Sequence, residues 1–253
     1  MRRRSMLLAV SGVLAVGGLV LPSIQQQQSR GDTRILSVVV NHGDDVVLGP
    51  STTTTFGFSI TAKDDSGIAG VDNVGIWGNN YGVLRPSAVT CKATADPAVS
   101  VCTGTASVNV KKRQIWDDQA GNWHVQATVH AKDGSRAESD TAGNFQVKKE
   151  STIIITGVPA RARAGDTITV DGLLEQPDWR SQSWVANAWQ PIELRFQPKG
   201  SSTWQTVKAL RTSGTGTMTA DVRVTESGTY QWYYPGKFWA QAMGSPTIAI
   251  TVG

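Results

Sequence analysis

The chain has 253 residues, enough for two domains of about 100 residues once a leader is removed. It carries 24 basic and 20 acidic side chains, but Arg2, Arg3 and Arg4 contribute three of the positive charges. Without them the balance is 21 to 20, and the basic runs that remain, Lys111-Lys112-Arg113 and Lys148-Lys149, are short. Because nucleic-acid binding needs clustered Lys and Arg, the composition excludes a nucleic-acid partner.

The N-terminus has the pattern of a secretory leader. An apolar run from Met6 to Leu21 follows the three arginines, and it is shorter than the roughly 20 residues of a membrane-spanning helix. We assign residues 1–23 to a signal peptide cleaved near Ser23, although retention as an uncleaved anchor stays open. No cysteine follows the run, so we expect a secreted or cell-surface protein that meets a membrane only through this segment.

Residues 24–33 are polar and predict a disordered arm. From Ile35 onward, apolar and polar residues alternate, with turn signals such as Asp133-Gly134 between the runs. Such alternation indicates strands with one buried face and one solvated face. The clearest buried faces are Phe56, Phe58, Ile60 and Ala62, and Trp123, Val125, Ala127, Val129 and Ala131.

The second half repeats the pattern, and residues 147–151 join one strand end to the next beginning. Gly121-Asn122-Trp123 and Gly228-Thr229-Tyr230 each start a late strand with an aromatic residue, as at the corner of immunoglobulin-like (Ig-like) strand F. The fold class is therefore all-β: two Ig-like β-sandwich domains in tandem after a signal peptide. We expect residues 34–149 to form the first sandwich, with a disulfide, and residues 150–253 a tryptophan-rich second one.

The chain has two cysteines, Cys91 and Cys102. They flank Asp96-Pro97 symmetrically, so a two-residue turn at that dipeptide places them opposite each other on neighbouring strands. An exported protein matures under oxidising conditions, which predicts a structural disulfide.

Catalytic motifs are missing from the sequence. It contains no Gly-x-Ser-x-Gly elbow and no Ser-x-x-Lys. Of its three histidines, His124 and His130 lie six residues apart on one strand, roughly 20 Å, too far to share a zinc ion. We therefore expect a protein that is not an enzyme and has no catalytic residues.

Acidic residues follow several of the predicted strands. Asp64 and Asp65 end one strand, and Asp133 follows another. Oxygen ligands from several loops are what calcium needs, although aspartate at a strand end also forms ordinary turns. A calcium site at Asp64, Asp65 and Asp133 is one hypothesis, and a protein without cofactor is the other.

Six of the nine tryptophans fall in the second half. Trp179, Trp184 and Trp189 are spaced at five-residue intervals in a polar segment, which predicts a loop where not every indole is buried. An exposed indole can bind a glycan or a peptide. The alternative is that these tryptophans complete the core of a small sandwich.

The residues also resemble a known group of proteins. Residues 184–207 with Ser227-Gly228-Thr229-Tyr230 look like the C-terminal Ig-like module of secreted actinobacterial proteins. Residues 37–41, 52–55 and 62–68 are similar to the uncharacterised β domain that precedes that module. The resemblance covers nearly the whole mature chain and implies no catalytic residue. Some members carry a calcium-binding label, for which the acidic residues are the candidates here.

The sequence thus favours a secreted or cell-surface, non-catalytic binding or structural protein. We expect a monomer whose partner is an extracellular protein or glycan. One alternative is a calcium-binding extracellular protein, and another is a carbohydrate-binding module that uses the tryptophan-rich surface.

Overall fold

The computed structural model describes residues 27–156 and 158–253. The predicted signal peptide lies outside these residues. The described chain is almost entirely strand and turn, with three short 3₁₀ helices at η1 (Asn41–Gly43), η2 (Asn79–Tyr81) and η3 (Asp117–Gln119). Over the described ranges, no helix has the length and apolar character needed to cross a membrane.

The first domain consists of two sheets that pack face to face. One sheet has the order β2 (Arg34–Val40), β4 (Thr53–Lys63), β8 (Val99–Asn109) and β7 (Thr90–Ala93). The other has the order β1 (Gln28–Arg30), β10 (Arg136–Lys149), β9 (Gly121–Ala131), β5 (Ile68–Gly78) and β6 (Val83–Leu84). Strand β3 (Val46–Leu48) pairs in parallel with the end of β10.

The second domain repeats this arrangement. In one sheet β13 (Thr167–Asp178) pairs with β11 (Thr152–Thr156), β14 (Ser183–Ala186) and β17 (Thr217–Arg223). The other has the order β12 (Arg161–Ala162), β20 (Ile248–Val252), β18 (Gly228–Tyr234), β15 (Pro191–Pro198) and β16 (Gln205–Arg211), and β19 (Met243–Gly244) pairs with β18.

The strand order identifies both domains as Ig-like sandwiches. In the first domain β2, β4, β8 and β7 take the places of strands A, B, E and D, while β5, β9 and β10 take those of C, F and G. In the second, β11, β13 and β17 correspond to A, B and E, and β15, β18 and β20 to C, F and G. The predicted fold class is confirmed.

Alternation along the strands produces the two cores. Phe56, Phe58, Ile60 and Ala62 on β4 are buried, as predicted, and so are Trp123 and the alternate residues after it on β9. At the start of each strand F, Trp123 and Tyr230 are also buried, which confirms the predicted corners. The indole Nε1 of Trp123 donates to the carbonyl of Gln119 at 2.8 Å, four residues upstream. This bond matches the one that a tyrosine hydroxyl makes at such a corner.

The disulfide prediction is confirmed, although the turn is longer than expected. Cys91 and Cys102 are directly opposite in the β7–β8 ladder and are bonded. Residues 95–98 form the loop, which closes by hydrogen bonds from Thr94 N to Val99 O and from Val99 N to Asp96 O. The hairpin loop therefore has four residues, where a two-residue loop was expected.

The prediction of a disordered arm over residues 24–33 is wrong for its last part. Gln28–Arg30 form β1, which pairs with residues 136–138 at the start of β10. The amide side chain of Gln27 accepts a hydrogen bond from Ile35 N at 3.2 Å. The sequence did not predict this strand because residues 28–30 have no apolar alternation. A short edge strand is held by main-chain bonds to its neighbour and not by burial.

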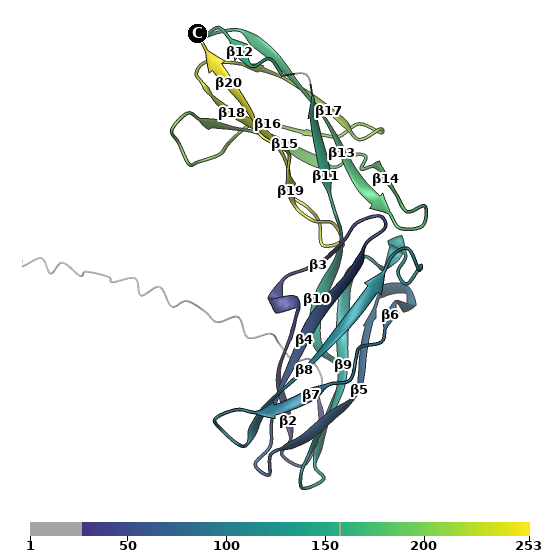
Figure 1. Cartoon of the computed structure of the whole chain (residues 1–253). Coiled ribbons are helices and arrows are strands. Elements are labelled where there is room, and N and C mark those ends of the chain that lie inside the picture. Colours follow the sequence, from purple (N-terminus) through teal and green to yellow (C-terminus); the bar gives the residue numbers. More distant parts are fainter. Residues whose placement is uncertain (1–26, 157) are drawn as a thin grey trace, which may run out of the picture.

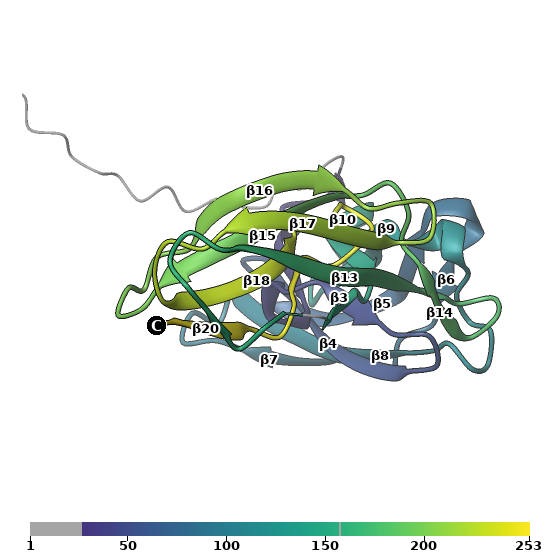
Figure 2. The same cartoon turned by 90° about the horizontal axis from the view of Figure 1, so that it is seen from above.

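The two sandwiches lie end to end, so that the second domain sits at one end of the first (Figure 1). Seen from above, the second domain covers much of the first (Figure 2). Strand β10 ends at Lys149 and β11 begins at Thr152. Such a short connection places the loops of the two domains in direct contact.

Candidate functional site

The contact between the two domains contains a network of polar bonds, and we call it the junction. Main-chain bonds run from Lys149 N to Trp239 O and from Gln241 N to Lys149 O, each 2.9 Å long. The hydroxyl of Ser151 donates to the carbonyl of Gln241 at 2.8 Å. The end of β10 is thereby joined to the loop between β18 and β19 of the second domain.

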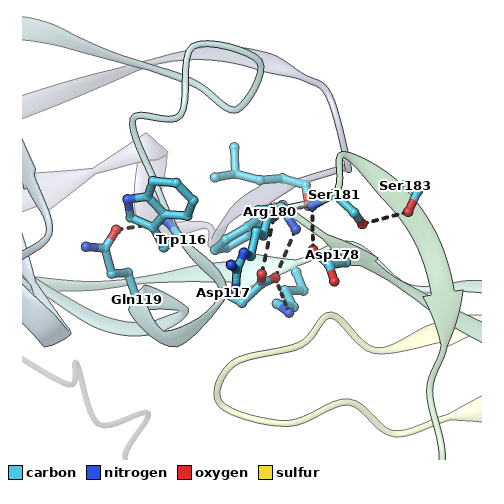
Figure 3. A network of polar contacts seen from close by, with 10 residues as sticks. Trp116, Asp117, Gln119, Asp178, Arg180, Ser181 and Ser183 are labelled. Atoms are coloured by element: carbon cyan, nitrogen blue, oxygen red, sulfur yellow. Dashed lines mark hydrogen bonds and ion pairs between the residues drawn. The ribbon is translucent and has the colours of Figure 1, made fainter.

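The carboxylate of Asp117, on η3 of the first domain, lies at the centre of the junction (Figure 3). Its Oδ1 accepts from Lys149 Nζ at 2.6 Å and from Trp179 N at 2.9 Å, and its Oδ2 accepts from Arg180 N at 3.3 Å. The Lys149 side chain is only 10% exposed, and its Nζ lies 5.5 Å from the centre of the Trp179 ring. A buried ammonium group is tolerated because this carboxylate and this indole face compensate its charge.

Trp179 is fully buried, which corrects the prediction that it belongs to an exposed ligand surface. Its indole packs into the core of the first domain, and its Nε1 donates to the carbonyl of Leu48 at 3.4 Å. Asp178, next to it, accepts a hydrogen bond from Ser181 N at 2.7 Å. This backbone bond, opposed by burial, holds the pKa of the Asp178 carboxyl below its usual value and stabilises the turn that follows Trp179.

A pocket of about 530 Å³ opens beside Asp117. Arg113 and Trp116 of the first domain and Arg180 of the second line it. The Arg113 guanidinium lies 5.7 Å from the centre of the Trp116 ring and donates to the carbonyl of Arg180 at 3.4 Å. Gln182 adds bonds to the carbonyls of Val110 and Lys111 at 3.3 and 3.1 Å. The pocket is therefore lined by groups that also connect the domains.

The other two predicted tryptophans are solvent-exposed. Trp184, on β14, is 37% exposed, and Trp189, in the turn after β14, is 66% exposed. The structure thus separates the predicted trio, with one indole at the junction and two at the surface of the second domain.

The acidic residues do come together. Ligand oxygens of Asp64, Asp65 and Asp133 lie within 4.8 Å of one another, together with those of Asp32. The cluster lies at the end of the first domain that faces away from the second, where β4 meets β5 and β9 meets β10 (Figure 1). Asp32 was not predicted to be part of it, because it belongs to the segment expected to be disordered.

Local hydrogen bonds fix two of the four carboxylates of the acidic cluster, those of Asp64 and Asp133. Asp64 is buried and accepts from the hydroxyl of Thr33 at 2.7 Å and from the hydroxyl and amide of Ser66 at 2.6 and 2.9 Å. Burial acts to raise the pKa of Asp64, but the bonds from Ser66 and Thr33 outweigh it and hold the pKa below its usual value. Asp133 accepts from the amide and hydroxyl of Ser135 at 2.8 and 3.0 Å. Four carboxylates, one of them held ionised, are oxygen donors that suit calcium.

Two of the three histidines have separate partners. His124 Nδ1 lies 2.6 Å from Asn144 Oδ1, and His130 Nε2 lies 3.0 Å from Asp72 Oδ1. Both cysteines are in the disulfide, so the described residues include no free thiol. These two imidazoles therefore have different neighbours in the first domain.

Comparisons with known proteins give distant structural likenesses. The D00-D0 domain of intimin is 11% identical, and the match covers 85% of this chain and 99% of that one, with a TM-score of 0.30. Three N-terminal domains of the outer capsid protein Hoc from bacteriophage RB49 are 8% identical over 87% of this chain and 71% of that one, with a TM-score of 0.34. A superoxide reductase from Ignicoccus hospitalis is 15% identical over 42% of this chain and 82% of that one, with a TM-score of 0.32.

No protein-family model matches the chain, and a search of curated proteins finds no match either. The TM-scores are too low to transfer any property, so the fold is defined by its own strand order.

Proposed function

We propose that this chain is an exported, non-catalytic binding or structural protein whose two Ig-like domains act as one rigid unit. The basic and apolar N-terminal sequence supports export, and so does the disulfide, since such bonds persist in oxidising compartments. The dispersed histidines support a role without catalysis. The partner would be an extracellular protein or a glycan.

The observation that carries this proposal is the junction. Domains of one chain ordinarily move relative to each other unless their interface is extensive and apolar. Here Trp179 of the second domain lies in the core of the first, and Asp117 fixes the turn that carries it. A fixed angle between two sandwiches serves a protein that spaces or presents binding surfaces, and it requires no chemistry at the junction.

Small-angle X-ray scattering of residues 27–253 tests the rigid unit. The wild-type profile is expected to fit one conformation, whereas a variant with a Gly-Ser insertion between Glu150 and Ser151 should show a larger maximum dimension. A wild-type profile that requires a broad ensemble would contradict the proposal. So would a hydrolytic activity that a single point substitution abolishes.

Export is tested by producing the full-length chain in a bacterial host. The product is expected outside the cytoplasm, with Cys91 and Cys102 oxidised and residues 1–23 removed. Recovery in the cytoplasm alone would count against export, whatever the scattering shows.

We propose calcium binding as a second candidate function, supported by the convergence of Asp32, Asp64, Asp65 and Asp133. Calcium takes six to eight oxygen ligands, so these carboxylates would be completed by carbonyl groups and water. At a calcium concentration about 100 times Kd, the free energy of unfolding should rise by about 2.7 kcal/mol.

The test is the melting temperature with calcium and with a chelator. Asp133→Asn should reduce the response to calcium, whereas Asp221→Asn in the second domain, where the carboxylate accepts a bond from Thr169, should leave it unchanged. If calcium produces neither binding heat nor a shift in the melting temperature of the wild type, calcium binding is ruled out. The rigid-unit proposal is tested separately, by scattering.

A further inference from the structure

Trp189 combines two unfavourable features, an exposed indole and a left-handed backbone. Its side chain is 66% exposed, and its φ is +61°. Positive φ is sterically costly for a bulky residue, and glycine would adopt it freely. Strain of this kind persists where the surrounding structure imposes it, and it concentrates at ligand-binding sites.

The turn that carries Trp189 is held by bonds to the last residue of β16, Arg211, and to the segment that follows it. Arg211 Nη1 donates to the carbonyl of Trp189 at 2.9 Å. Gln190 N donates to the hydroxyl of Thr212 at 2.9 Å, and that hydroxyl donates to the carbonyl of Asn187 at 2.8 Å. Asn187 and Thr212 are both buried. The backbone on both sides of the indole is therefore fixed before any ligand arrives.

The indole itself lies against a glycine. A Cβ atom added to Gly214 would stand 3.2 Å from Cζ2 of Trp189, so the absence of a side chain at this position allows the ring to lie close to the loop. Tyr81 provides a contrast, because it also has positive φ, at +61°, but is 99% exposed. The ring of Trp189 thus lies against the loop at Gly214, and about two thirds of the residue's surface is exposed.

Hydroxyl groups surround Gly214 along the chain. The hydroxyl of Ser213 lies 2.9 Å from that of Thr215 and 2.7 Å from that of Thr217, and it also accepts bonds from the amides of both threonines. A threonine hydroxyl has one hydrogen and two acceptor positions, so Thr215 and Thr217 keep acceptor capacity for a ligand. The loop segment that approaches the indole at Gly214 therefore carries three hydroxyl groups, those of Ser213, Thr215 and Thr217.

We propose that Trp189 and the hydroxyls of Thr215 and Thr217 form a binding site for a β-linked pyranose oligosaccharide. A pyranose ring with equatorial hydroxyls has a flat face of C–H groups, which packs on an indole, and a rim of O–H donors, which match the threonine acceptors. A protein partner would favour a broader buried apolar centre than one supported ring. This inference rests on the proposed binding function and names its ligand class.

The experiment is calorimetric titration of residues 27–253 with cellohexaose and chitohexaose, with a polyproline peptide as a third probe. Saturable binding of at least one saccharide and none of the peptide is expected. Trp189→Gly should weaken saccharide binding at least ten-fold, while its melting temperature should not fall, because glycine relieves the positive φ. Gly214→Ala should also weaken binding, since the added methyl group displaces the indole.

The matched control is Tyr81→Ala, which removes an unsupported exposed ring and should leave the dissociation constant unchanged within two-fold. Binding of neither saccharide, equal binding by Trp189→Gly, or binding of the peptide alone would overturn the saccharide site. These outcomes leave the rigid unit intact, because that proposal is decided by scattering.

Discussion

At the level of single residues, Lys149 and Asp117 illustrate how a buried charge is made acceptable. The ammonium group of Lys149 has an ion pair and an indole face as neighbours, and the carboxylate of Asp117 has two backbone amides in addition. The pair itself adds little net stability, because removing both charges from water is costly. Loss of one partner is different, since it leaves the other charge buried and alone.

Asp117→Asn should therefore destabilise the chain by roughly 2 to 3 kcal/mol, less than a fully buried pair because the Asp117 side chain is 33% exposed. Glu138→Gln is the matched control. It breaks the 3.9 Å contact between Glu138 and Arg136. Both side chains are about half exposed, so the loss should cost less than about 1 kcal/mol. Urea unfolding of both variants measures the difference. Equal costs would show that Asp117 has no special role at the junction.

A second residue-level prediction concerns alkaline pH and Tyr234. Burial, only partly offset by a hydrogen bond with Asn187, raises the pKa of this phenol to about 12. In the unfolded chain its pKa is about 10. The neutral phenol thus contributes stability that is complete below pH 10 and is lost as the pH rises towards 12. The loss is on the order of 3 kcal/mol.

The variant Tyr234→Phe should lose less stability than the wild type between pH 10 and pH 12. Burial, together with the charge of Glu226, also raises the pKa of Tyr230, which stays in both proteins, so the variant should retain part of the decline. Urea unfolding across this range measures the slope. Parallel slopes for variant and wild type would contradict the buried-phenol explanation.

At the level of elements, the sequence predicted the features that depend on residues close together in the chain. Alternation located β4 and β9, and symmetric spacing placed Cys91 opposite Cys102. The features that sequence reasoning missed depend on contacts made far along the chain. The indole of Trp179 is buried by the other domain, and Asp32 joins the acidic cluster through β1, whose partner is more than 100 residues away.

The hairpin of β7 and β8 gives a prediction at this level. Replacement of both Cys91 and Cys102 by alanine should destabilise the chain by roughly 3 kcal/mol, because the unfolded chain gains the freedom of the opened loop. The first domain should still fold, since β8 remains paired with β4 along 11 residue pairs. Denaturant unfolding under oxidising conditions measures the cost. Loss of the folded baseline, which would make the disulfide essential for folding, would contradict this expectation.

At the level of the whole molecule, the two cores are not independent. Trp179 belongs to the core of the first domain, and Trp239 packs against the cores of both. Domains linked in this way should unfold together, because opening the junction exposes apolar surface on each side. The two hydrophobic cores are thus coupled through two indoles contributed by the second domain.

Trp179→Ala should uncouple them. Removing a fully buried indole leaves a cavity in the core of the first domain and should cost about 3 to 5 kcal/mol. The first domain loses this packing, whereas the second loses only its attachment, so calorimetry should change from one transition to two. Trp184→Ala, which removes a partly exposed indole from the same hairpin, should keep one transition and cost about 1 kcal/mol. If Trp179→Ala still unfolds in a single step, or if the wild type already unfolds in two, then the junction does not couple the domains and the rigid-unit proposal loses its energetic basis.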